Sequence, residues 1–371
     1  MKRRSFLEST ALAAGVGLLS LDSVRAESAP TAVAVDRISI TLPEGWRVFD
    51  VVTRIDVPAG GKSSKVWLPL PSVNEPQWIR PMGNLWQSNA AEIHIVTEPV
   101  YGTQMLYAEW PDNAAPPALE VLTRSALRDR QVDFNKPDKS KKLSDAERAL
   151  YTRPTKLLPT DGIVKTTADQ IIKGKNSDRE QARAIYDWVV DNTFREPKVR
   201  GCGLGDIRFM LESGDLGGKC ADINALYVGL ARSAGLPARD VYGVRVTESR
   251  MGFKSLGKRG DCSKGQHCRA EVWLDGYGWV PVDPADVRKV VLEEPPGNLP
   301  LDSEPVKKAR RFLFGGWEMN WMAYSVAHDL KLPNSSGPEV AYLMYPQAEV
   351  DGKRRDSLDP ESFRYRCSAS G

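Results

Sequence analysis

Short runs in which apolar side chains occupy every second position dominate the chain between residues 34 and 134. The segment FDVVTRIDV alternates in this way over residues 49–57, which is the period of a half-buried strand. Further apolar runs, KVWLPLP, EIHIV, MLYAEW and ALEVLTR, follow between Gly, Pro and Asn breaks. Strands at this spacing predict an antiparallel β-sandwich-like domain, to which we assign residues 27–140.

The apolar period becomes helical after the lysine-rich segment NKPDKSKKLSD. One predicted helix opens with Ser177 and Glu180 at the spacing of a capping box and continues with an apolar stripe. A second helical pattern begins at Cys220, and the segments VYGVRV, HCRAEVWL and WVPVD then predict strands. Residues 141–371, including the tail, are therefore expected to form a mixed region, which makes the fold class α+β.

The charge of the chain is nearly balanced outside its N-terminus. The formal net charge is +3, and residues 1–26 carry four basic and two acidic side chains, so removing this segment leaves +1. A body this close to neutral argues against nucleic acid as the main partner.

Residues 1–26 have the pattern of a twin-arginine-type signal peptide. A basic start with Arg3 and Arg4 precedes the apolar stretch ALAAGVGLLSL and the small-residue site VRA. An uncleaved anchor is the alternative interpretation. The signal predicts export to the periplasm, with no stable membrane insertion once it is removed.

The periplasm is oxidising, so the five cysteines need an explanation. An odd number leaves at least one thiol free in a single chain. If Cys220 is the free one, the other four form up to two bridges, and three pairings are open. A bridge between Cys262 and Cys268 would close a short loop.

Cys220 stands where a nucleophile would be activated. Gly217 and Gly218 precede it, and we expect their backbone freedom to let the chain turn sharply into the helix. Unpaired N–H groups and the positive end of the helix dipole favour thiolate over thiol. The alternative is a small apolar residue that only packs.

A thiol nucleophile needs a base, and the chain has three histidines. His94 lies in a predicted strand of the sandwich, and His328 in a predicted helix near the tail. His267 begins the strand HCRAEVWL directly after a Gly- and Lys-rich loop, where an imidazole can reach a cleft.

The segment LDGYGW predicts a hairpin turn that brings Asp283 to the same end of the hairpin as His267. Side chains alternate between faces, so a two-residue loop would point these two residues to opposite sides. A three-residue loop or a bulge is therefore predicted. The same alternation places Arg269 on the face of His267 and Cys268 on the other.

These residues together resemble the transglutaminase-like superfamily, whose core is papain-like. The match rests on GGKCADINALYVGLARSAGLPAR, then a histidine that opens a strand, then GYGWVPVDP, with the order Cys, His, Asp at separations of 47 (267 − 220) and 16 (283 − 267) residues. The resemblance implies Cys220 as nucleophile, His267 as general acid and base, and Asp283 as the carboxylate that orients the histidine. The chain departs from the family after the histidine, where Cys268 and Arg269 stand.

Several further residues are candidates for binding the oxyanion or for contacting the substrate. The backbone N–H of Cys220 is expected to bind the oxyanion, with Trp188 or Asn192 as a second donor. Gly218, Arg269 and Trp279 are the candidates for contact with substrate. The sequence shows no run of metal ligands, and neither a metal nor a cofactor is expected.

The sequence thus predicts a periplasmic thiol enzyme that acts on amide bonds of peptides or proteins through a thioester. Water as the second reactant makes it a peptidase or amidase, and an amine makes it a transamidase. The alternative is a catalytically silent transglutaminase-like protein that binds or scaffolds a partner in the periplasm.

Overall fold

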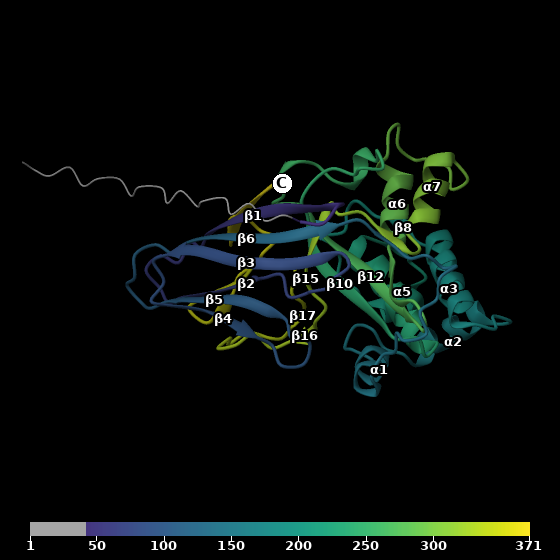
Figure 1. Cartoon of the computed structure of the whole chain (residues 1–371). Coiled ribbons are helices and arrows are strands. Elements are labelled where there is room, and N and C mark those ends of the chain that lie inside the picture. The colour runs from purple at the N-terminus through teal and green to yellow at the C-terminus, as the bar shows by residue number, and fades with distance from the viewer. Residues whose placement is uncertain (1–41) are drawn as a thin grey trace, which may run out of the picture. The chain divides into compact units, whose positions relative to one another are not determined.

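Residues 42–371 are described by a computed structural model, and two five-stranded antiparallel sheets build one side of this part of the chain (Figure 1). The first sheet has the order β11 (Gly260–Asp261), β20 (Arg364–Ser370), β1 (Trp46–Asp56), β6 (Ala118–Arg128) and β3 (Ile79–Ser88). The second has the order β19 (Lys353–Arg354), β18 (Gln347–Val350), β2 (Ser64–Pro69), β5 (Gln104–Trp110) and β4 (Glu92–Thr97). The signal segment predicted for residues 1–26 lies outside the described residues.

The two sheets pack face to face. Val66 and Leu106 of the second sheet share one buried cluster with Ile55 and Val121 of the first. The period of two in the sequence is the cause, because it gives each strand one apolar face that must be covered. The predicted sandwich-like arrangement is confirmed.

The end of the chain completes both sheets. Strand β18 pairs with β2, and β20 pairs with β1 from Asp50↔Ser370 to Asp56↔Arg364. The predicted boundary at residue 140 assigns the whole tail to the second region. In the structure, β18 and β20 of the tail pair instead with strands of the first region. Residues 42–371 form a single compact unit.

The second region is built on a four-stranded sheet with the order β13 (Gly278–Val282), β12 (Gln266–Leu274), β10 (Ala238–Arg245) and β15 (Trp321–Ser325). The helices are α1 (Asp145–Thr152), α2 (Gly162–Ile172), α3 (Asp178–Asn192), α4 (Ile207–Ser213), α5 (Cys220–Ser233), α6 (Pro284–Glu293) and α7 (Glu304–Phe312), with the 3₁₀ turn η1 (Lys254–Leu256). Short strand pairs are β7 (Arg130–Gln131) with β14 (Gly316–Trp317), β8 (Phe194–Arg195) with β9 (Gly217–Gly218), and β16 (His328–Leu330) with β17 (Val340–Tyr342).

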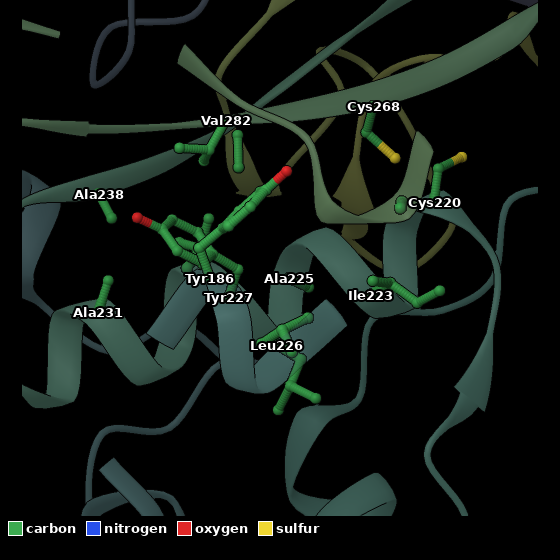
Figure 2. Close-up of a cluster of buried hydrophobic side chains, with 14 of the residues drawn as sticks. Tyr186, Cys220, Ile223, Ala225, Leu226, Tyr227, Ala231, Ala238, Cys268 and Val282 are labelled. Carbon is green, nitrogen blue, oxygen red and sulfur yellow. The ribbon is translucent and has the colours of Figure 1, made fainter. Parts of the chain in front are cut away.

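Helix α5 lies at the centre of this region. All its residues are buried, and it packs against β10 and β12 on one side and against α2, α3 and α6 on others (Figures 1 and 2). Helix α3 begins with the predicted capping box, in which the Ser177 side chain accepts from the Glu180 N–H. The predicted α+β class with a preceding β-sandwich is confirmed.

Cys262 forms a disulfide with Cys367, so the expected bridge between Cys262 and Cys268 is wrong. The two cysteines are 105 residues apart in sequence, and they meet because β11 pairs with the last strand, β20. Cys268 packs in the core cluster that contains α5, whereas Cys262 and Cys367 belong to a different cluster. Cys202, Cys220 and Cys268 are free thiols.

Removing this bridge is expected to destabilise the protein strongly, because it closes a long loop in the unfolded chain. The double substitution Cys262→Ser/Cys367→Ser should lower the free energy of unfolding by about 2–5 kcal/mol. Guanidinium unfolding with and without a thiol reductant measures this. The reductant should weaken the wild-type protein and leave the double variant unchanged, whereas a wild-type protein that ignores the reductant would contradict the bridge.

Candidate active site

Cys220 is the first residue of α5, and the segment before it is held tightly. Strand β9 pairs with β8 through Phe194↔Gly217 and Arg195↔Gly218. A Cβ on Gly217 would lie 2.5 Å from the Phe194 ring, and one on Gly218 would lie 2.5 Å from the Asp222 Cβ. Neither glycine has a positive φ, so the expected reason for the glycines is wrong. They are needed because there is no room for a side chain, and the sharp turn requires no unusual backbone angle.

The carboxylate of Asp222 fixes the start of the helix. Its Oδ2 accepts from the Lys219 N–H at 2.9 Å, and its Oδ1 accepts from the N–H groups of Leu204 and Gly205, each at 2.9 Å. The Ala221 N–H donates to the Cys202 carbonyl at 2.8 Å. Within residues 42–371, these bonds leave the Cys220 N–H without an acceptor, so it is available to a ligand.

The β12–β13 hairpin has the register that the sequence predicts. The pairs run from Ala270↔Val282 to Leu274↔Gly278, so three residues, 275–277, form the loop. His267 and Asp283 consequently face the same side, and the His267 Nε2 lies 2.8 Å from the Asp283 Oδ2. This bond fixes the ring and leaves Nδ1 as the nitrogen that can exchange a proton elsewhere.

Asp283 is completely buried and is held from several directions. Its Oδ1 accepts from the Asn224 Nδ2 at 3.1 Å and from the Asp286 N–H at 3.0 Å, the latter as the N-cap of α6. Asn224 also donates to the Cys268 carbonyl at 2.8 Å. This amide, one turn after Cys220, joins α5, β12 and α6 at the site. The sequence analysis did not predict it, although its position four residues after the cysteine could have indicated it.

A second carboxylate, Asp286, lies beside the histidine and was not predicted. Its Oδ1 is 3.5 Å from the His267 Nε2 and accepts from the Arg245 Nη2 at 2.5 Å. Burial and the charge of Arg245 lower the pKa of His267, but the carboxylates of Asp286 and Asp283 outweigh them and raise it above its usual value. The raised pKa shifts the balance of His267 toward the imidazolium form.

His267, Asp283 and Asp286 present donor atoms that all lie within 4.8 Å of one another, a spacing that can hold a metal ion. Their charges already have other partners. Arg245 binds Asp286, and the Arg269 Nε lies 3.6 Å from the Asp283 Oδ2. Two guanidinium groups would repel a cation placed between these carboxylates, so the cluster fits an orienting network for His267 better than a metal site.

Two thiols and the imidazole surround the Cys220 sulfur. Hydrogen bonds from Cys202 and then Cys268 lower the pKa of Cys220, His267 adds a hydrogen bond and its charge, and burial opposes them without reversing the direction. Figure 2 shows Cys220 at the start of α5 beside Cys268 of β12, above the packed side chains of Ile223 and Leu226. A lowered cysteine pKa and a raised histidine pKa together favour a thiolate–imidazolium pair.

The proton of Cys202 has two acceptors. Its Sγ donates to the Gln266 carbonyl at 3.3 Å and also lies within reach of the Cys220 sulfur. A thiolate is the stronger acceptor because it is charged, so ionisation of Cys220 should draw the Cys202 proton toward it. Contact with Cys220 and burial raise the pKa of Cys202, which keeps this thiol protonated as a donor.

Replacing Cys202 tests this donor. Cys202→Ala should slow alkylation of Cys220 by iodoacetamide about tenfold at pH 7, since a hydrogen bond to a charged group contributes about 1.5–3 kcal/mol. Cys202→Ser keeps a donor and should restore most of the rate. The rates are measured by mass spectrometry of the Cys220 peptide, and equal rates in the wild-type protein and Cys202→Ala would contradict the assignment.

A cavity of about 510 Å³ opens onto Cys220 and His267. Cys202 and Tyr345 also line it, and part of its wall comes from the tail at residues 357–366. The sequence did not predict that the tail reaches the site. The tail lies there because its strands pair with the two N-terminal sheets.

The other predicted site residues do not line this cavity. Trp188 borders a different pocket, and the Asn192 Nδ2 donates to the Trp188 carbonyl at 2.8 Å. Arg269 is buried against Trp321 and donates to the Glu318 carbonyl at 3.1 Å. Trp279 stacks with the Arg239 guanidinium, whose carbon lies 4.1 Å from its ring centroid. Gly218 carries the chain to Cys220 but is not part of the cavity wall.

The remaining histidines are outside the site. His94 lies exposed in β4, with its Nδ1 3.4 Å from the Glu92 carboxylate. His328 lies in β16, so the predicted helix around it is wrong, and its Nε2 is 3.2 Å from the Asp240 Oδ2. Pairing with β17 imposes the strand there.

Comparisons with known proteins show the family and the fold. The family model of the transglutaminase-like superfamily matches residues 165–284, which contain all three candidate catalytic residues. An uncharacterized protein of Haemophilus influenzae is 35% identical over 342 residues, which cover 87% of this chain and 90% of that protein.

A solved structure has a similar fold. A candidate cysteine protease from Cytophaga hutchinsonii matches with a TM-score of 0.52 at 13% identity, over 87% of this chain and 91% of that one. At this identity the likeness concerns the fold. Within residues 42–371, no helix combines the length and the apolar character needed to cross a membrane. From the family model and the relative of similar length, the chain belongs to the transglutaminase-like superfamily.

Proposed function

We propose that the protein is a thiol-dependent acyl-transfer enzyme that acts on amide bonds of peptides or proteins. The observation that carries this proposal is that Cys220 and His267 line one cavity while the His267 ring is bonded to the buried Asp283 at 2.8 Å. These positions support Cys220 as the nucleophile, His267 as the base and Asp283 as the orienting carboxylate, the three roles that covalent acyl transfer requires.

In the first half of the reaction, the Cys220 thiolate attacks the amide carbonyl carbon. The free N–H of Cys220 is the candidate donor to the oxyanion that forms. The His267 imidazolium gives its proton to the leaving amine as the C–N bond breaks, and a thioester on Cys220 remains. The Asp283 and Asp286 carboxylates stabilise the charged imidazole before this transfer.

In the second half, neutral His267 accepts a proton from the incoming nucleophile, which attacks the thioester and releases Cys220. We favour water as that nucleophile, because at ~55 M it competes in any cleft that does not exclude it. The enzyme is then a peptidase or amidase. We also propose that it works in the periplasm after export by the signal segment, residues 1–26.

Trapping the covalent intermediate tests the proposal. The protein is incubated with a periplasmic extract, quenched in acid and digested, and the Cys220 peptide is examined by mass spectrometry. An acyl group on Cys220, absent from the Cys220→Ala variant, is expected, and its mass identifies the acyl donor. An unmodified Cys220 thiol after prolonged incubation would instead favour the silent binding protein.

A further inference from the structure

The wall of the cavity above Cys220 is strongly basic. Of the 21 residues that line it, eight are Lys or Arg and none is Asp or Glu. The whole chain is nearly balanced, with 51 basic and 48 acidic residues, so this concentration is local. A cavity with one sign of charge attracts ligands of the opposite sign, because its low-dielectric walls focus the field.

Part of this charge is neutralised by carboxylates that pair with the lining residues but do not themselves line the cavity. Arg200 is 2.5 Å from Asp356, and the Lys289 Nζ is 3.6 Å from the Glu293 carboxylate, which also binds Arg195. Arg245 belongs to the network around His267, and the Arg364 Nη2 lies 3.4 Å from the Glu361 Oε1. These side chains have structural partners and need no ligand.

Three cations have no such partner. Among residues 42–371, no carboxylate lies within 4.0 Å of Lys219, Lys264 or Arg366. Lys219 directly precedes the nucleophile, Lys264 lies in the loop before β12, and Arg366 belongs to β20. The three therefore approach the cavity from separate segments, and the disulfide Cys262–Cys367 fixes the last two segments to each other.

We propose that these three cations bind carboxylate groups of the acyl donor, so that the enzyme selects peptides that carry a free carboxylate. That the bound peptide is an acyl donor rests on the proposed function, whereas the binding of its carboxylate does not. Lys and Arg recognise carboxylates by charge-assisted hydrogen bonds, and the cavity volume of about 510 Å³ suits a short peptide segment. The carboxylates are either acidic side chains or the free C-terminus of a peptide.

Binding to the inactive Cys220→Ala variant tests the proposal without turnover. Three N-acetylated, fluorescently labelled peptides are compared by anisotropy: one with two glutamates and an amidated C-terminus, one with glutamines and a free C-terminus, and one with glutamines and an amidated C-terminus. We expect at least one carboxylate peptide to bind about tenfold more tightly than the neutral peptide at 50 mM salt. The peptide that gains identifies the source of the carboxylate, and 0.5 M salt should reduce the difference.

Charge variants decide whether Lys264 and Arg366, two of these three cations, are responsible for the preference. Added to Cys220→Ala, the changes Lys264→Gln and Arg366→Gln should remove most of the preference for the carboxylate peptide while affinity for the neutral peptide stays the same. A matched control, Lys307→Gln with Arg311→Gln on α7, removes two charges outside the cavity wall and should keep the preference. Equal affinities for all three peptides, or equal losses in both double variants, would overturn the proposal.

The two proposals fail in different ways. If a carboxylate peptide binds preferentially but never leaves an acyl group on Cys220 of the wild-type protein, the proposed function is overturned. The proposed basic binding site is then supported. Acyl transfer with no preference for carboxylate peptides would do the reverse.

Discussion

Replacing Cys220 by alanine should reduce acyl transfer by about 10⁴-fold or more, since among the three free thiols at the site Cys220 is the one whose pKa is lowered. The neighbouring thiols do not substitute for it. The pKa of Cys202 and that of Cys268 are raised, so both remain protonated near neutral pH. The measurement is the burst of p-nitrophenol released from p-nitrophenyl acetate, an activated ester small enough to enter the cavity.

The fold should survive this substitution. Cys220 is the first residue of α5, and alanine fits a helix start without a new polar group. The thermal midpoint is the control and should change by only a few degrees. A burst of unchanged size in a folded Cys220→Ala variant would contradict the assignment of the nucleophile.

Asp283→Asn should slow turnover of the acetyl-enzyme on the order of 10³–10⁴-fold, by analogy with orienting carboxylates in other triads. Asp283 touches no substrate and acts through His267, so it is a positioning residue. Asparagine would keep the size and the capping of α6 but would not favour the imidazolium or its correct tautomer. Deacylation depends on His267 as a base, and its rate is therefore the measurement.

A matched variant separates this role from stability. Asp283→Ala loses the helix cap as well, which costs about 1 kcal/mol more in unfolding free energy than Asp283→Asn. Both should lose activity to a similar extent and should shift the pH profile of the remaining activity. An Asp283→Asn variant with the wild-type pH profile would contradict the positioning role.

Local sequence signals predicted the parts of the site that depend on neighbouring residues. Whether a hairpin loop has an odd or an even number of residues decides which side chains share a face, and this depends only on nearby residues. The three-residue loop and the shared face of His267 and Asp283 could therefore be predicted from the alternation of side chains and from the glycines. The start of α5 was also evident, because an apolar period and a glycine pair mark it. The segments around Cys220, His267 and Asp283, together with the order and spacing of these residues, were enough for the family.

Contacts between distant segments could not be predicted. Asp286 and Arg245 meet His267 only after β10, β12 and α6 have packed, and nothing near either residue signals this in the sequence. The pairing of Cys262 with Cys367 and the tail wall of the cavity need β20 to return to β1 across the whole chain. Such long-range pairings carry no local periodicity.

The pH dependence of Cys220 alkylation tests the central claim most directly, because it reports the ionisation of this sulfur without assuming a substrate. A lowered cysteine pKa means that more of the sulfur is thiolate at pH 7 than in a free cysteine, so the rate with iodoacetamide should be higher at pH 7 and its midpoint should lie below the ~8.5 of a free cysteine. Asp283→Asn should move the midpoint upward, since it weakens the imidazolium partner. A Cys220 that reacts with the midpoint of a free thiol, or that stays unmodified at every pH while the protein is folded, would contradict the account.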